Sequence, residues 1–343
     1  MPRIRPLTFW LALKKISPHA TTLLYICRDL PSAANEFRWI QEHITATPSK
    51  IPPQIRLQHL CSQRAKGIPL QYLLGTQPFG DLEILCRPGV LIPRPETEAY
   101  TLELASILKR QLTRPKPSTN NNLNILDICT GTGCIALQLY ASLAPTIPTH
   151  ITAIDISPTA IALARRNLIH NTRLGNLPNP PPSSSIEFTP LSLFSPSLLS
   201  SLSHKPIDIL VSNPPYISRS SFTRTTSRSV RNHEPRLALV PEHDDVSVEL
   251  GCEAEDVFYA KMLQVARDLT PHPRVVLFEV ADMAQAERVV GLVKREDALR
   301  GWYNVVEIWR DWPHREVESD AVDGVLVRGE GEGRVVYLCR DLE

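Results

Sequence analysis

Two spacings of hydrophobic residues divide the chain at about residue 76. In residues 1–75 apolar positions recur three and four residues apart, as at Phe37, Ile40 and Ile44, and no alternating run occurs. This spacing is typical of amphipathic helices, whereas strands buried on one face alternate. Prolines break the segment into pieces. We therefore expect a small helical domain over residues 1–75.

The next segment, residues 76–99, has the pattern of a hairpin linker. Short apolar runs within residues 79–92 lie on either side of the turn signal Arg87-Pro88-Gly89, which predicts two paired strands. A helix is expected to follow from about Tyr100 to Leu112. The polar, proline-containing residues 113–122 predict a loop.

Short apolar runs then alternate with amphipathic segments, and we expect one domain over residues 100–343. The expected strands are residues 124–128, 151–156, 207–212, 274–280, 303–309 and 334–339. The expected helices are residues 135–143, 159–169, 257–269 and 283–294. This alternation predicts an α/β fold with a mostly parallel, doubly wound sheet, closed by an antiparallel hairpin. Residues 172–185 are expected to be an exposed insertion, and residues 313–333 an added acidic, glycine-rich loop.

Charge is distributed unevenly along a chain whose net charge is only +1. Residues 1–120 hold 16 Lys and Arg against 8 Asp and Glu, a net of +8. Residues 121–343 hold 21 against 28, a net of −7. The small total gives no general attraction to nucleic acid. The basic front half suits docking on an acidic partner, or ordinary surface variation together with a targeting segment.

The first thirty residues carry five basic side chains and a single acid, Asp29. The stretch Leu7–Ile16 is apolar with interleaved lysines and is expected to form an amphipathic helix. This composition favours a mitochondrial presequence. The alternative is the plain first helix of the domain in a cytoplasmic protein, because both interpretations predict a basic helix.

Composition argues against several other classes of protein. No run of eighteen apolar residues occurs, so no membrane-spanning helix is expected. The seven cysteines include no C-x-x-C pair and their number is odd, which predicts neither a zinc site nor a disulfide framework. We therefore expect a reduced intracellular enzyme without a bound metal.

A glycine-containing turn at residues 129–133 is the first candidate binding site. It follows an expected strand and precedes a helix, so its backbone can turn tightly and present the helix N-terminus to a ligand. Ala136 stands where a dinucleotide-binding loop has its third glycine, and no P-loop lysine follows. Asp155, at the end of the next strand, could accept hydrogen bonds from both hydroxyls of a ribose. The adenosine of NAD and that of S-adenosylmethionine fit equally well, and a helix-capping role for Asp155 is the alternative.

The second candidate site is Asn213-Pro214-Pro215-Tyr216, which directly follows the expected strand 207–212. The prolines fix φ and lack N–H groups, so the loop presents carbonyl oxygens at the carboxyl end of a strand, where ligands bind. The Asn213 side-chain oxygen and the Pro214 carbonyl could accept both protons of a planar amide or amine nitrogen, while the Tyr216 ring lies on its flat face. Methyl transfer from a sulfonium would then depend on positioning and electrostatics. A rigid turn without chemistry is the alternative.

In combination, several segments resemble the HemK/PrmC family of release-factor glutamine methyltransferases. The segments are Gln71–Gly75, Phe79-Gly80, Val90–Glu98, Asp127–Leu137, Ser212–Ile217, Val230–Pro235 and Ala238-Leu239. The resemblance runs from about residue 65 to residue 280. The Asn-Pro-Pro-Tyr motif alone is less specific, because adenine-N6 DNA methyltransferases and some RNA guanine methyltransferases share it.

The resemblance implies a Rossmann-like methyltransferase fold with a seven-stranded sheet and S-adenosylmethionine as cofactor. The implied cofactor-binding residues are Cys129, Thr130, Gly131, Thr132, Gly133, Asp155, Leu193 and Asn213. The implied catalytic residues are Asn213, Pro214 and Tyr216, and the implied substrate-binding residues are Asn213, Pro214, Pro215, Tyr216, Arg94 and Glu96. The helical domain would grip a peptide chain release factor, whose Gly-Gly-Gln glutamine a monomeric enzyme would methylate at N5. A structural ion pair is the alternative for Arg94 and Glu96.

Three departures from the family pattern bear on the site. The family usually has glycine where Cys129 stands, and we expect the change to be tolerated if the backbone there needs no positive φ. An Asp-Trp-Phe-like trio appears only as Ser192-Leu193-Phe194, so the adenine would pack against Leu193 in place of an indole. The stretch after Ala238 lacks the expected Gly-Gly.

Two rival functions remain open. A nucleic-acid methyltransferase acting on adenine N6 or guanine N2 would need a basic channel and a way to extrude the base, and the net charge of −7 over residues 121–343 argues against it. A non-catalytic S-adenosylmethionine-binding assembly factor would be expected to show decay in the Asn-Pro-Pro-Tyr loop, which is intact.

Overall fold

The computed structural model describes residues 4–112, 122–177, 183–202, 206–315, 320–322 and 324–340. Within it the chain forms two compact units. The first comprises residues 1–76, 86–88 and 226–234, and the second comprises residues 77–85, 89–225 and 235–343. Most of the predicted loop 113–122, and parts of the predicted insertions 172–185 and 313–333, lie outside the described residues.

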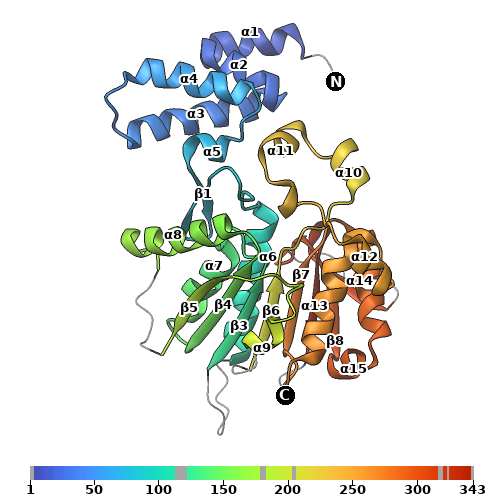
Figure 1. Ribbon diagram of the computed structural model, residues 1–343. Helices are drawn as coiled ribbons and strands as arrows, with labels where there is room; N and C mark the ends of the chain where they lie inside the picture. Colours follow the sequence, from blue (N-terminus) through green and yellow to red (C-terminus); the bar gives the residue numbers. More distant parts are fainter. Residues whose placement is uncertain are drawn as a thin grey trace. The chain divides into compact units, whose positions relative to one another are not determined.

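The first unit is helical, as the apolar spacing predicted (Figure 1). Its helices are α1 (Pro6–Lys15), α2 (Pro18–Cys27), α3 (Leu30–Ala46), α4 (Pro53–Ala65), α5 (Leu70–Leu74) and α11 (Arg228–His233). Prolines stand in the first turn of α1 to α4, where a missing N–H is harmless. The interrupting prolines therefore mark where helices begin.

Helix α1 contributes to the hydrophobic core of this unit. Ala12 is fully buried, and Phe9 and Ile16 pack against the same core as Leu23 and Ile40. The segment with presequence-like composition is thus a helix, which both interpretations of it predicted. In this structure it is also an integral part of the helical unit.

The hairpin lies earlier in the chain than the sequence pattern indicated. Its strands are β1 (Thr76–Phe79) and β2 (Leu82–Leu85), so Gly80 and Asp81 connect them, and Gly80 has a φ of +56°. The predicted turn at residues 87–89 leads into a segment without strand structure. The prediction failed because a two-residue turn containing a single glycine gives a weaker signal than Arg-Pro-Gly. Side-chain amides of Asn167 and Asn171 bind the backbone of β2.

The second unit is built on a nine-stranded sheet in the order β5-β4-β3-β6-β7-β11-β8-β10-β9. The strands are β3 (Leu123–Ile128), β4 (Thr149–Asp155), β5 (Ser185–Pro190), β6 (Ile209–Ser212), β7 (Val275–Glu279), β8 (Val305–Trp312), β9 (Asp320–Val322), β10 (Val325–Arg328) and β11 (Glu330–Cys339). Strands β3 to β7 pair in parallel. Strand β11 pairs antiparallel with β7 and β8, which confirms the closing hairpin.

Helices cover both faces of this sheet (Figure 1). Along β7, Val275 and Leu277 belong to one core and Val276 and Phe278 to the other, as expected of a strand buried on both faces. Helices α6 (Pro95–Leu112), α7 (Cys134–Leu143) and α8 (Pro158–Leu174) contribute to the first core. Helices α9 (Leu198–Leu202), α13 (Val257–Asp268), α14 (Met283–Arg295) and α15 (Asp297–Trp302) contribute to the second. Short helices α10 (Arg219–Arg224) and α12 (Asp244–Glu249) lie in the connection between β6 and α13.

The sheet has two strands more than the seven implied by the family resemblance. Strands β9 and β10 come from residues 313–333, for which a loop was expected, and β10 pairs in parallel with β8. Val325 and Val327 are buried while Leu326 is exposed, an alternation that is hard to detect among acids and glycines. Strand β5 was also not predicted, because serines and prolines surround it.

Candidate active site

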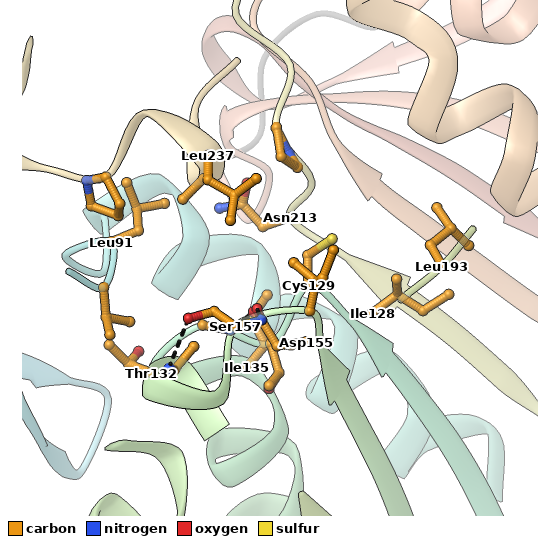
Figure 2. Close-up of a pocket in the computed structure, with 18 of the residues that line it drawn as sticks. Leu91, Ile128, Cys129, Thr132, Ile135, Asp155, Ser157, Leu193, Asn213 and Leu237 are labelled. Atoms are coloured by element: carbon orange, nitrogen blue, oxygen red, sulfur yellow. Dashed lines mark hydrogen bonds between the residues drawn. The ribbon is translucent and has the colours of Figure 1, made fainter. Parts of the chain in front are cut away.

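The two candidate loops line one cavity in the second unit. They follow β3 and β6, which are adjacent parallel strands. The strand order reverses here, since β4 lies on one side of β3 and β6 on the other, and such a switch point is where ligands bind in open α/β sheets. The cavity holds about 1050 Å³ of empty space including its open mouth. Figure 2 shows Cys129, Asp155, Leu193 and Asn213 around it.

The loop after β3 is held both by its own residues and by side chains from the adjacent strand β4 and helix α8. The Thr130 hydroxyl donates to Asp127 Oδ2 at 2.6 Å, and the Gly131 N–H donates to Asp155 Oδ2 at 2.9 Å. Asp127 is fully buried. Burial raises the pKa of its carboxyl to about 7, although the hydrogen bond from Thr130 acts to lower it. Asp127 therefore supports the loop and is not among the residues lining the cavity.

Cys129 corrects one expectation about this loop. Its φ is +62°, in the left-handed region where a Cβ is unfavourable and glycine is the usual residue. The position therefore does need a positive φ, contrary to the condition under which the change from glycine was expected to be neutral. Burial raises the pKa of the Cys129 thiol, so the side chain stays neutral beside the Asp155 carboxylate.

Gly133 is required at the start of helix α7. Its φ is +81°, and a Cβ there would lie 3.0 Å from both Ala164 Cβ and Phe188 Cε1. Those contacts are too close for a side chain at this position. The loop therefore passes directly against α8 and β5 before the helix begins.

Asp155 ends β4 and faces the cavity. Its Oδ1 accepts the Ser157 N–H at 2.8 Å, while Oδ2 accepts the Gly131 N–H. Burial raises the pKa of Asp155, and the hydrogen bonds from Ser157 and Gly131 oppose that shift. The helix cap itself is Ser157, whose hydroxyl accepts the Ala160 N–H. Asp155 thus fixes the first loop and also presents a carboxylate to the cavity.

An apolar and aromatic wall lies further along the cavity. Leu193 is 4% exposed and lines it with Phe194. The Phe194 ring packs against His243 with 3.9 Å between ring centroids and the planes tilted by 32°, and it meets Phe258 edge-on at 5.1 Å. Sequence reasoning named Leu193 but not His243 or Phe258. His243 and Phe258 come from segments after β6, and neither belongs to a motif that the sequence analysis recognised.

The loop after β6 is held by side chains from distant segments. The Asn213 Nδ2 donates to Thr97 Oγ1 at 3.4 Å, and the Tyr216 hydroxyl donates to Glu279 Oε1 at 3.0 Å. Thr97 in turn donates to Glu279 Oε2 at 2.6 Å. Glu279 is 1% exposed at the end of β7. Burial raises the pKa of this carboxyl, while hydrogen bonding by Thr97, Tyr100 and Tyr216 and the charge of Arg334 oppose the shift.

Most of the residues singled out from the sequence meet at this cavity. Those that line it are Arg94, Cys129, Thr130, Gly131, Thr132, Asp155, Leu193, Asn213 and Pro215. Gly133, Pro214, Tyr216 and Glu96 are not among the lining residues, and their assigned roles stay predictions. Thr97 and Glu279 were missed. Thr97 lies inside a segment already singled out, and Glu279, like Asp155, is an acid that ends an apolar strand.

The described part of the chain lacks two further features. None of its helices combines the length and hydrophobicity that a membrane span requires. The same residues contain no cluster of three or more His, Cys, Asp or Glu side chains arranged to hold a metal ion.

Comparison with known proteins identifies the family. Residues 105–238 match the family described as "Methyltransferase small domain". The Saccharomyces cerevisiae protein named "Mitochondrial MRF1 N(5)-glutamine methyltransferase MTQ1" is 38% identical over 343 residues, which cover 98% of this chain and 88% of that protein. The Schizosaccharomyces pombe protein named "Probable MRF1 mitochondrial N(5)-glutamine methyltransferase mtq1" is 34% identical, with 82% and 86% covered. A "Release factor glutamine methyltransferase" of Mycolicibacterium smegmatis is 37% identical, with 56% and 57% covered.

These relatives confirm the resemblance that the motifs indicated. The matched segments include both loops of the cavity, since the family match spans the strands β3 and β6 that precede them. With 38% identity across 98% of its length, the chain belongs to the family of release-factor N(5)-glutamine methyltransferases.

Proposed function

We propose that this protein transfers a methyl group from S-adenosylmethionine to the side-chain amide nitrogen, N5, of the glutamine in the Gly-Gly-Gln loop of a mitochondrial peptide chain release factor. The observation that carries this proposal is the pairing of two loops at one cavity. One presents the Asp155 carboxylate and the other presents Asn213. The relatives' names supply the class of substrate.

The cavity has the chemistry that S-adenosylmethionine requires. The Asp155 carboxylate is placed to accept hydrogen bonds from ribose hydroxyls, and Leu193 with Ile156 offers apolar surface to an adenine ring. At Gly131 the loop presents only its backbone to the cavity, so a ligand can approach it closely. When bound, the cofactor supplies a methyl group on a positively charged sulfur.

The Asn-Pro-Pro-Tyr loop suits a planar amide as acceptor. The lone pair of an amide nitrogen is delocalised, so the nitrogen reacts only if it is held in the right orientation. In our proposal Asn213 Oδ1 and the Pro214 carbonyl accept the two N–H protons of the glutamine, and Tyr216 completes the clamp with Pro215 beside it. Arg94 and Glu96 border the substrate. Positioning and electrostatic stabilisation then dominate the rate, and the nitrogen sheds its extra proton after transfer.

The helical unit suits a docking role in this reaction. Residues 1–76 hold ten Lys and Arg against three Asp and Glu. Helix α1 exposes Leu7, Trp10 and Leu13, spaced three residues apart on one side. A basic surface with exposed apolar side chains fits a protein partner with acidic patches. We propose that this surface binds the release factor, that the enzyme acts as a monomer, and that it works in mitochondria, as the names of its fungal relatives indicate.

The test uses the full-length protein, isotope-labelled S-adenosylmethionine and a purified mitochondrial-type release factor. Peptide mass spectrometry locates the added methyl group. We expect it on the Gly-Gly-Gln glutamine, and we expect it to disappear with Asn213→Ala and with a factor whose glutamine is changed to glutamate. Label entering DNA or RNA in place of the factor would overturn the substrate assignment. Cofactor binding without any transfer would favour a non-catalytic role.

A further inference from the structure

A buried chain of hydrogen bonds runs from Glu279 to the side chain of Asn213. Glu279 Oε2 accepts the Thr97 hydroxyl at 2.6 Å, and Thr97 Oγ1 accepts Asn213 Nδ2 at 3.4 Å. Glu279 and Thr97 are 1% and 2% exposed, so water does not take over these contacts. The second bond is long, as catalytic hydrogen bonds often are before substrate binds.

The direction of this chain follows from the chemistry of its members. The Thr97 hydroxyl has one proton and donates it to Glu279 Oε2, the direction that an ionised carboxylate requires because it can only accept. The oxygen of Thr97 is then left to accept, and Asn213 can meet it only with its NH₂ group. The carbonyl oxygen Oδ1, the other polar atom of the Asn213 amide, is consequently not the atom that faces Thr97. No donor among the described residues binds it.

We propose that Glu279, acting through Thr97, is a positioning residue that fixes which way the Asn213 amide faces. The consequence is that Asn213 offers an acceptor, not a donor, to the reacting nitrogen. This inference rests on the proposed function, because an N–H-bearing acceptor amide is the group that needs a hydrogen-bond acceptor there. With the amide turned round, two NH₂ groups would face each other across the cavity.

The Tyr216 hydroxyl strengthens the same arrangement. It donates to the other oxygen of Glu279, at 3.0 Å. Both oxygens of the carboxylate are therefore occupied by donors from the two segments that border the cavity, residues 95–98 and residues 213–216. These two donors favour the ionised form of Glu279 against the burial that raises its pKa, and the ionised form keeps the direction of the chain.

The decisive variant is Glu279→Gln, which keeps the shape of the side chain but adds a donor. The new NH₂ faces either Thr97 or Tyr216. Where it faces Thr97, it donates to the hydroxyl, which then donates to Asn213 Oδ1 and turns the amide round. We expect kcat on the release factor to fall about 100-fold, as when one preorganised hydrogen bond at a reacting centre is lost. We expect KM and cofactor affinity to change little, because the lost hydrogen bond stabilises the transition state and not the bound ground state.

Thr97 provides a pair of variants that are less disruptive to the fold. Thr97→Val removes the hydroxyl at nearly constant volume and should lower kcat as Glu279→Gln does, whereas Thr97→Ser should restore it. The double variant with Glu279→Gln should be no slower than either single one, because the residues act as one chain. Asp208→Asn, which changes a carboxylate that accepts the Asn124 N–H at the opposite end of β6, is the matched control and should keep kcat.

A second measurement separates this inference from the proposed function. Nuclear Overhauser contacts between the Asn213 side-chain amide protons and the Thr97 methyl group should be present in the free wild-type protein and absent in Glu279→Gln. If wild type does not methylate glutamine, the proposed function fails, while these contacts still test the chain. A wild-type kcat in Thr97→Val, or the absence of these contacts in the wild-type protein, would overturn the positioning role.

Discussion

The two loops of the cavity lie at the ends of neighbouring strands but are held in opposite ways. The loop after β3 is held by its own residues, as where Asp127 binds Thr130, and by the next strand and helix. The Asp155 carboxylate accepts the Gly131 N–H, and the Asn167 amide donates to the Thr132 carbonyl. The loop after β6 depends on Thr97, 116 residues before Asn213, and on Glu279, 63 residues after Tyr216. The cofactor loop is thus held by its own strand and the strand and helix that follow it, whereas the amide clamp needs side chains from segments far away in the sequence.

The largest effect is expected at the clamp itself. Asn213→Ala should lower kcat by about 10²- to 10³-fold, the range for one lost preorganised group at a reacting centre. Cofactor affinity, measured by calorimetry, should fall far less. If both quantities fell together by the same factor, the two loops would not have separate roles and the comparison between them would fail.

The next effect belongs to the cofactor loop. Asp155→Asn keeps the shape but removes the charge that strengthens hydrogen bonds to ribose hydroxyls. We expect S-adenosylmethionine to bind with a Kd raised by about 10- to 100-fold, corresponding to about 1.5–3 kcal/mol for charge-assisted bonds. The value of kcat at saturating cofactor should remain close to that of wild type. An unchanged Kd would leave Asp155 with only its contacts to Gly131 and Ser157.

A smaller effect concerns stability and pH. The pKa of Asp127 rises from 3.8 to about 7 on folding, so the native state holds a proton that the unfolded state releases. The stability associated with this proton is present below about pH 4 and is lost as the pH rises to about 7. Between pH 5 and pH 7 wild type should lose about 1–2 kcal/mol relative to Asp127→Asn. Urea unfolding at both pH values measures this, and a constant difference would contradict it.

The smallest effect is expected at Cys129. Cys129→Gly should raise the free energy of unfolding by about 0.5–1 kcal/mol, because it removes the Cβ that makes a left-handed φ unfavourable. The greater freedom of glycine in the unfolded chain offsets part of this gain. Cys129→Ala keeps a Cβ at the same φ and should show no such gain. A more stable alanine variant would mean that the backbone at this position is not strained.

The sequence was sufficient to find both loops because each is a short motif at the end of a recognisable strand. It also predicted the helical front unit and the closing hairpin of β8 and β11. Glu279 was missed because its partners are Thr97 and Tyr216, and nothing along the chain shows that these three meet. The φ of Cys129 was missed because a side chain other than glycine or asparagine gives no signal of a left-handed backbone.

The remaining errors have a common physical cause. Strands β9 and β10 have few residues, and their apolar positions are interrupted by glycines and acids, so their pairing depends on β8 more than on their own pattern. The hairpin of β1 and β2 is likewise fixed by amides from α8. In each case tertiary contacts outweighed local preference.

The central claim is that the clamp directs methylation to an amide nitrogen. The most direct test follows a carbon-labelled methyl donor and a Gly-Gly-Gln release factor whose glutamine side-chain nitrogen is also isotope-labelled. The account predicts that magnetic resonance of the product shows the labelled methyl carbon bonded to the labelled nitrogen. With Asn213→Ala this signal should build up about 10²- to 10³-fold more slowly. A methyl group on any other atom of the factor, or on nucleic acid added to the same reaction, would contradict it.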